Sequence, residues 1–137
     1  MERESAQGRG EGNASMPTHR PTILVVDDDP AVLTLATAFL THRRYRVRTA
    51  EGGKEAISMA SRPGRIDLVL IDIAMPGLNG FAVAERLLAM RPGLEMLYMS
   101  GYAEQLSHYA PRVPERLFLS KPFGADELWS RVGRLVG

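Results

Sequence analysis

The sequence contains no cysteine among its 137 residues, which excludes disulfide bonds, thiolate metal sites and thiol-based catalysis. It also lacks any apolar run near the roughly 20 residues that a membrane-spanning helix needs, so no membrane insertion is expected. Neither sign of charge dominates, because 17 Lys and Arg oppose 16 Asp and Glu and the net charge is +1. We therefore expect no direct binding of nucleic acid through overall charge.

The chain divides by composition into a short leader and one domain. Residues 1–20 mix Gly, Ser, Arg and Glu without an apolar centre, so they lack the pattern of a secretory signal and are expected to form a disordered leader. The whole sequence is 45% hydrophobic and 24% charged, which is ordinary globular composition. We predict a single domain over residues 21–137, and the absence of cysteine fits a reducing compartment, the cytoplasm.

Apolar runs of strand length alternate with stretches of helical period, which indicates βα units around a parallel sheet. The predicted strands are Thr22–Asp27, Arg46–Ala50, Ile66–Asp72, Glu95–Met99 and Arg116–Ser120. The first, third and fourth carry continuous apolar runs and should be central, whereas the second alternates in polarity and suits a sheet edge. With right-handed crossovers, the predicted fold is a flavodoxin-like (βα)5 three-layer sandwich of strand order 2-1-3-4-5.

Helical periodicity predicts the elements that cover this sheet. In the first helix, Asp29 and Pro30 begin the helix and one apolar face is predicted from spacing: Val32, Leu35, Ala36, Phe39 and Leu40. Apolar spacing also predicts a second helix around Ala56, Ile57 and Ala60, a third after Asn79 and a fifth from Ala125. The fourth segment, Ala103 to Glu115, contains Pro111 and Pro114, so helix 4 should be short or irregular.

The ends of the first and third strands are acidic. The first strand ends in Asp27, which Asp28 and Asp29 follow, and Asp72 ends the third, so their side chains should converge at the topological switch point of the sheet. Converging carboxylates repel unless a cation neutralises them, and hard oxygen ligands suit Mg²⁺. An acidic run can also simply cap a helix and face solvent, but its place directly after a buried strand favours a magnesium site.

Strands four and five bring a hydroxyl and an ammonium group to the same rim. Ser100 follows the fourth strand and Lys121 the fifth. Singly, Ser100 could turn the chain and Lys121 could be a solvated loop residue. Phosphoryl transfer, however, needs an in-line nucleophile, a bridging metal ion and donors for the phosphoryl oxygens. Asp72, a Mg²⁺ ion on Asp28, and the pair Ser100 and Lys121 would fill those roles.

Four stretches, in this order, are similar to a known family: ILVVDDDP, DLVLIDIAMPGLNG, MSGYAE and FLSKPF. Over about residues 21–137 the chain resembles the response-regulator receiver domains of two-component signalling. The resemblance implies a domain that takes a phosphoryl group from a histidine kinase or a histidine phosphotransfer protein and then changes conformation. Such a domain is not an enzyme for a separate substrate, because it catalyses only its own Mg²⁺-dependent phosphorylation and dephosphorylation.

The resemblance also implies roles for individual residues. Asp72 would be the phosphoacceptor, and Mg²⁺, for which Mn²⁺ can substitute, would be held by Asp27, Asp28, Asp72 and the main-chain carbonyl of Ala74. Ser100 and Phe118 would form the conformational switch, and Lys121 would pair with the phosphoryl oxygens, its bond to Pro122 being cis. Ala74 and Tyr102 would tune the lifetime of the phosphorylated state.

Several alternatives remain open at the level of sequence. The sequence fits both a stand-alone receiver and the receiver of a hybrid histidine kinase. It also fits a docking partner at helix 4, strand 5 and helix 5, and a homodimer that forms on phosphorylation. A haloacid-dehalogenase phosphatase would use an Asp-x-Asp pattern such as Asp27 to Asp29, but the chain lacks a later acidic pair near the lysine and a cap domain. A flavodoxin-type module that binds flavin is a further alternative, but the three carboxylates after the first strand would repel the phosphate of the flavin. A receiver that signals by binding alone would not need Asp28, Asp72, Ser100 and Lys121 together.

Overall fold

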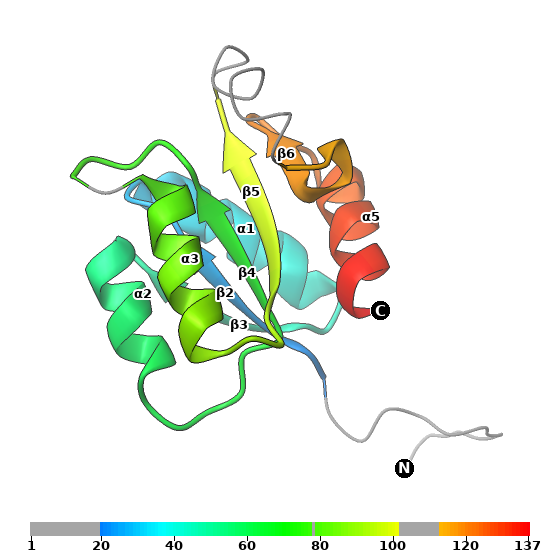
Figure 1. The fold of residues 1–137 in the computed structure, drawn as a ribbon. Helices are drawn as coiled ribbons and strands as arrows, with labels where there is room; N and C mark the ends of the chain where they lie inside the picture. The colour runs from blue at the N-terminus through cyan, green and yellow to red at the C-terminus, as the bar shows by residue number, and fades with distance from the viewer. Residues whose placement is uncertain (1–19, 78, 102–112) are drawn as a thin grey trace, which may run out of the picture.

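The computed structural model describes residues 20–77, 79–101 and 113–137, which form a five-stranded parallel sheet. Its strands are β2 (Thr22–Val26), β3 (Arg46–Ala50), β4 (Leu68–Asp72), β5 (Glu95–Ser100) and β6 (Phe118–Ser120). They lie in the order β3-β2-β4-β5-β6. Counted along the chain this is the order 2-1-3-4-5, so the predicted flavodoxin-like topology is confirmed (Figure 1).

Helices cover both faces of the sheet, which makes three layers (Figure 1). On one face lie α1 (Pro30–His42) and α5 (Ala125–Val136), and on the other lie α2 (Gly53–Ala60) and α3 (Gly80–Met90). Each face has its own apolar core, and β2 and β4 are buried along their whole length, as their continuous apolar runs predicted. In β3 only Ala50 is buried, which is the pattern of an edge strand.

Two predicted strands begin two residues too early. The strand predicted from Ile66 begins at Leu68, because the Asp67 carboxylate accepts the Thr22 N–H at 2.8 Å and holds the preceding residues in a loop. The strand predicted from Arg116 begins at Phe118, because Glu115–Leu117 form a turn of 3₁₀ helix. The other predicted strand ends agree within one residue. Of the predicted fourth helical segment, residues 103–112 lie outside the described residues.

The predicted buried face of α1 was partly wrong. The helix buries Leu33, Ala36 and Leu40, whereas Leu35 is 41% exposed. The sequence could not distinguish the two faces, because α1 contains no Asp, Glu, Lys or Arg and both faces therefore look apolar. The predicted start was correct, since Asp29 caps the helix by accepting the Ala31 N–H at 2.9 Å.

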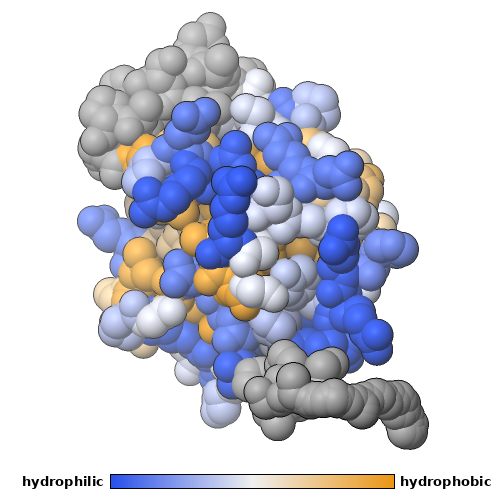
Figure 2. Space-filling view, turned by 90° about the vertical axis from the view of Figure 1, so that its right-hand side faces the viewer, coloured by the Kyte–Doolittle hydropathy of each residue, from blue (hydrophilic) through white to orange (hydrophobic). Residues whose placement is uncertain are grey.

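Trp129 joins α5 to the end of α1. Its indole N–H donates to the Phe39 carbonyl at 2.7 Å, which satisfies one of the free carbonyls at the helix C-terminus. The His42 ring stacks on the indole at 5.6 Å between centroids, and the Arg43 guanidinium lies 4.1 Å from the centroid of the indole ring. Around α5 the surface is mostly hydrophilic, with hydrophobic residues in small groups between the charged ones (Figure 2).

Arg91 fixes the connection between α2 and β4. Its guanidinium donates to three backbone carbonyls, those of Ala60 at 3.0 Å, Arg62 at 2.8 Å and Gly64 at 2.6 Å. A planar guanidinium can reach three carbonyls at once, whereas a lysine ammonium at the end of a flexible stem cannot reproduce this fork. The Arg91 side chain therefore connects the C-terminus of α3 to the loop that leads into β4 through three hydrogen bonds.

Arg91→Ala should lower the free energy of unfolding by about 2 kcal/mol, because three carbonyls lose a charged donor. Arg91→Lys should recover less than half of that loss, as measured by urea denaturation. The matched control is Arg86→Ala on the exposed face of α3, which should change stability by less than about 0.5 kcal/mol. Full stability in Arg91→Lys would contradict the role of the fork.

None of the α-helices in the described ranges combines the length and the apolar character that crossing a membrane would require.

Candidate functional site

The carboxyl ends of β2 and β4 bring three predicted acidic residues together. Asp27, Asp28 and Asp72 each offer a carboxylate oxygen within 4.8 Å of the other two. Asp27 is fully buried and Asp72 is 5% exposed, while Asp28 faces solvent. In the part of the chain that is described, this is the one cluster of three acidic or histidine side chains close enough to share a metal ion.

Backbone groups fix the orientation of the two buried carboxylates. One oxygen of Asp27 accepts the Asp29 N–H at 2.9 Å, and one oxygen of Asp72 accepts the Ala74 N–H at 2.9 Å. Both bonds close a turn over two residues just after the strand ends, so the side chains are held at the rim of the sheet. The second oxygen of each carboxylate is left for a common partner.

That partner is Lys121, which follows β6. Its ammonium group lies 2.7 Å from Asp27 Oδ2 and 3.1 Å from Asp72 Oδ2, and its backbone N–H donates to the Ser100 carbonyl at 2.9 Å. The peptide bond between Lys121 and Pro122 is cis. A lysine far away in the sequence thus bridges two carboxylates that would otherwise repel each other, and its single positive charge offsets part of theirs.

Burial and ion pairing have opposite effects on the pKa values of Asp27 and Lys121. Burial raises the pKa of the Asp27 carboxyl above its usual 3.8, and this outweighs the lowering by the hydrogen bond from Lys121. Burial alone would lower the pKa of the Lys121 ammonium, but the hydrogen bonds and charges of Asp27 and Asp72 raise it above 10.5. The lysine therefore stays charged, and it is the cation that the acidic cluster already contains.

These residues surround a cleft of about 410 Å³ at the carboxyl edge of the sheet. It is lined by Asp27, Asp28, Asp29, Asp72, Ala74, Gly101 and Lys121. The cleft therefore gathers the predicted acceptor, the acidic pair, Ala74 and the lysine around one open space. It has room for a hydrated cation and a phosphoryl group next to the Asp72 carboxylate.

Two predicted residues, Ser100 and Phe118, do not line the cleft in the described part of the chain. Ser100 ends β5 and is buried at 1% exposure, next to Gly101, which does line it. Phe118 is buried at 6% exposure on the α3 side of the sheet, where its ring meets the rings of Phe81 and Tyr98 with centroids 6.5 and 6.1 Å away. Tyr102 lies outside the described residues.

Gly80 supports the site in a way that sequence reasoning missed. It is the first residue of α3, and a Cβ atom there would lie 2.3 Å from the Asp72 carbonyl oxygen and 2.7 Å from Ile73 Cα. Its own N–H donates to the Ile73 carbonyl at 3.1 Å. Only glycine allows the helix to start so close to the backbone of the predicted acceptor. The signal in the sequence was a glycine directly after the Asn79 cap.

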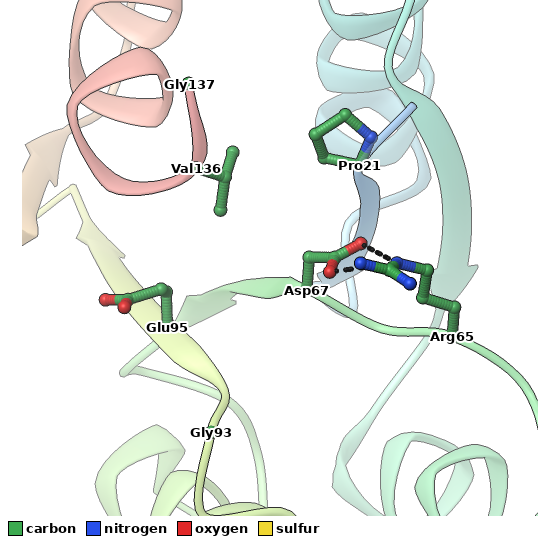
Figure 3. A pocket seen from close by; sticks show the side chains of 7 residues that line it. All are labelled: Pro21, Arg65, Asp67, Gly93, Glu95, Val136 and Gly137. Carbon is green, nitrogen blue, oxygen red and sulfur yellow. Dashed lines mark hydrogen bonds and ion pairs between the residues drawn. The ribbon is translucent and has the colours of Figure 1, made fainter. Parts of the chain in front are cut away.

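A second cavity, of about 360 Å³, lies near the opposite, amino edge of the sheet (Figure 3). Its charged side chains include Arg65 and Asp67, which point toward each other and form hydrogen bonds of 3.1 and 3.0 Å. Asp67 also accepts the Thr22 N–H, so both of its oxygens are engaged in holding the loop. This cavity brings together none of the predicted site residues.

The fold and the site together define a doubly wound α/β domain with an acidic, lysine-containing cleft at its switch point. Comparison with known proteins then identifies the family. The model of the response regulator receiver domain family matches residues 23–133, and the chain belongs to this family. It is a receiver domain, the signalling module of two-component response regulators.

Individual relatives agree with this assignment. The response regulator SaeR of Staphylococcus aureus is 28% identical over 115 residues, which are 83% of this chain and 50% of SaeR. The chain thus spans about half the length of the curated relatives it matches.

Solved structures resemble the chain over more of their own length. The response regulator TrrA of Thermotoga maritima, solved in complex with Mg(2+)-BeF, is 33% identical with a TM-score of 0.71, covering 85% of this chain and 99% of TrrA. The receiver domain of the hybrid histidine kinase CckA is 30% identical with a TM-score of 0.70, covering 85% and 99%. None of these three relatives is a phosphatase of the haloacid-dehalogenase type.

Proposed function

We propose that Asp72 accepts a phosphoryl group from a histidine kinase or a histidine phosphotransfer protein and that the new charge switches the conformation of the domain. The observation that carries the proposal is the position of the Asp72 carboxylate. It lies at the cleft, bonded on one side by a backbone N–H and on the other by the Lys121 ammonium. The carboxylate is thereby oriented and paired with a shared cation while it still lines the cleft.

The chemistry follows from these contacts. An Asp72 oxygen attacks the phosphorus atom while the bond from phosphorus to the donor's histidine nitrogen breaks. The Ala74 N–H keeps the carboxylate oriented, and the Lys121 ammonium pairs with the incoming phosphoryl oxygens. Asp27 keeps its bond to the ammonium throughout and so positions the lysine.

The same residues fit a magnesium ion. The oxygens of Asp27, Asp28 and Asp72 are hard ligands within 4.8 Å of one another, and Asp28 is exposed and has no ion pair with Lys121. We expect these three side chains and the Ala74 carbonyl to hold Mg²⁺, with Mn²⁺ as a substitute. When bound, the ion neutralises charge on the phosphoryl oxygens. The complex of TrrA with Mg(2+)-BeF supports this assignment by similarity.

For the switch, we propose that the Ser100 hydroxyl moves toward the phosphoryl group and that Phe118 follows. In this structure the Phe118 ring is already buried beside the rings of Phe81 and Tyr98, so the proposed response of Phe118 is a repacking of its ring within the core rather than a move from an exposed position. Ala74 lines the cleft beside the acceptor and, with Tyr102, is proposed to govern the access of water that hydrolyses the phosphorylated state.

Incubation with acetyl phosphate and Mg²⁺ tests the function directly. Intact-mass measurement should show one added phosphoryl group, and EDTA should suppress it. No adduct in the presence of Mg²⁺ would refute the proposal. The phosphatase alternative predicts instead the turnover of a phosphate monoester such as para-nitrophenyl phosphate, lost in Asp27→Asn. We expect no such turnover, because the proposed reaction is confined to the domain's own aspartate.

Docking of the phosphodonor is proposed to involve the uncharged face of α1, which begins directly after Asp29 at the cleft. Leu35 on this helix is 41% exposed. Leu35→Glu should slow phosphotransfer from the cognate kinase by at least about tenfold, because an apolar anchor is replaced by a charge. Labelling by acetyl phosphate should not change, since this donor needs no protein docking. Met90→Glu on α3, which is 40% exposed, is the matched control and should leave both rates unchanged. Equal loss in both variants would argue against docking at α1.

The remaining proposals concern the setting of the domain. We propose a leader over residues 1–20, a receiver domain over 21–137, and a location in the cytoplasm. A downstream partner, or a second phosphorylated copy, is proposed to dock at β6, α5 and the predicted fourth helical segment, of which residues 103–112 lie outside the described residues. The relatives include both a response regulator and a hybrid-kinase receiver, so both settings remain compatible with the proposed role.

A further inference from the structure

Within the described part of the chain, the edge strand β3 has free hydrogen-bonding groups along its outer side. Among these residues it pairs with β2 alone. The Arg46 N–H donates to the Pro21 carbonyl at 2.9 Å, and the Ala50 carbonyl accepts the Asp27 N–H at 3.1 Å, so alternate residues from Arg46 to Ala50 face β2. The N–H and carbonyl groups of Val47 and Thr49 therefore point outward.

Arginines surround this open edge. Four of the six residues from 43 to 48 are arginine, and Arg43, Arg44 and Arg46 are exposed while Arg48 is half-buried. The ion pairs of the described residues involve other cations, namely Arg65, Lys121 and Arg131. The arginine charges are therefore not neutralised locally, although the whole chain carries a net charge of only +1.

Two of these arginines project from the same face of the strand. Val47 packs against the core under α1 and α5, so its neighbours Arg46 and Arg48 lie on the opposite face of the sheet. This placement agrees with the position of an Arg48 guanidinium nitrogen, which would be 3.4 Å from a Cβ on Gly64 in the connection between α2 and β4. Arg46 and Arg48 thus project from one face of β3 on either side of Val47, one of the two residues with outward backbone groups.

We propose that the β3 edge binds an extended acidic segment of a partner protein as a sixth strand of the sheet. Free N–H and carbonyl groups in strand geometry fit a polypeptide backbone, which would pair with Val47 and Thr49. The partner's Asp or Glu side chains, at alternate positions, would meet Arg46 and Arg48 on one face.

Other occupants fit less well. A second copy of this strand would place arginines against arginines, and like charges on neighbouring strands repel. A nucleic acid would satisfy the guanidinium groups but not the outward backbone groups of Val47 and Thr49. An acidic extended peptide can pair with both the guanidinium groups and the outward backbone groups, so it is the occupant that fits this edge best.

This site is separate from the proposed phosphoacceptor. In the sheet, β2 lies between β3 and β4, the strand that ends in Asp72. Binding at β3 should therefore persist in Asp72→Asn and in the absence of Mg²⁺. A failure of the proposed function would leave this inference unaffected, and the reverse also holds.

Titration of the ¹⁵N-labelled chain with synthetic peptides tests the inference. The probe is an eight-residue peptide in which Glu alternates with Val and Thr; one control has the same composition with the Glu residues clustered, and another has Lys in place of Glu. We expect the largest amide shifts at Val47 and Thr49, binding at least about tenfold weaker for the clustered peptide, and none for the Lys peptide.

Variants separate the two kinds of contact. The double variant Arg46→Glu/Arg48→Glu should weaken binding at least about tenfold, whereas Arg86→Glu/Arg134→Glu, with the same change in net charge at exposed positions on α3 and α5, should not. Thr49→Pro removes an outward N–H that has no partner in the sheet and should also abolish binding. If the melting curve shows that Thr49→Pro does not fold, the double variant Arg46→Glu/Arg48→Glu alone tests the inference.

Two results would overturn the inference. Equal binding of the clustered peptide or of a single-stranded oligonucleotide, without shifts at the Val47 and Thr49 amides, would show a general attraction for anions. No binding of the alternating peptide would show that the arginines only protect the edge against association with other strands.

Discussion

Asp72→Asn is expected to remove the phosphorylated species completely, both with acetyl phosphate and with a protein donor. The asparagine amide is not a nucleophile toward phosphorus, so the covalent step has no acceptor. The fold should survive, because the side-chain carbonyl of asparagine can still accept the Ala74 N–H and Lys121 keeps its bond to Asp27. Intact mass after incubation with donor and Mg²⁺ gives the result.

The matched control for this experiment is Asp29→Asn. Asp29 lines the same cleft, but its carboxylate accepts the Ala31 N–H as the cap of α1, and asparagine caps helices equally well. This variant should still be labelled to nearly the same extent. An adduct that persists in Asp72→Asn would assign the acceptor to another residue, and loss of labelling in both variants would mean that the charge of the cleft, rather than one carboxylate, is required.

Gly80→Ala should lower the free energy of unfolding by about 3 kcal/mol, a large effect for the addition of one methyl group. The new Cβ would lie 2.3 Å from the Asp72 carbonyl oxygen and 2.7 Å from Ile73 Cα, and backbone atoms cannot move away as a flexible side chain can. Because this backbone carries the proposed acceptor, the rate of phosphorylation by acetyl phosphate should fall in the fraction that remains folded.

Gly133→Ala is the control for this prediction, because the same substitution should here raise the free energy of unfolding. A Cβ at Gly133 in α5 would meet no atom within 4 Å, so alanine should raise the free energy of unfolding by about 0.5 to 1 kcal/mol through its higher helix propensity. Denaturant unfolding of both variants measures the contrast. If Gly80→Ala were as stable as the parent, α3 would not need to approach β4 as closely as the structure shows.

The order of the strands was predictable from patterns within single segments combined with the right-handedness of the crossovers between parallel strands. Continuous apolar runs identified the central strands, and the alternating polarity of Arg46 to Ala50 identified the edge. Given that order, the ends of the strands had to bring Asp27, Asp28 and Asp72 together, since parallel strands finish at the same edge. The cluster at the cleft therefore followed from the topology.

Features that depend on contacts between segments were not predictable. Leu35 is exposed and Leu33 is buried because of the orientation in which α1 packs on the sheet. The sequence of α1 contains no Asp, Glu, Lys or Arg that would indicate which face is buried. The role of Gly80 requires knowing how near α3 comes to β4. Lys121 was expected to meet a phosphoryl group, whereas in this structure it already bridges two carboxylates that are distant in sequence.

Trp129 has a consequence for how the domain can be observed. It is the single tryptophan of the chain, and its indole lies between α1 and α5, hydrogen-bonded to Phe39 and in contact with His42 and Arg43. Its fluorescence therefore comes from one known position, away from the cleft, without any added dye. A change in emission on phosphorylation would report that the rearrangement has reached the junction of these helices, and constant emission would show that it does not extend to this junction.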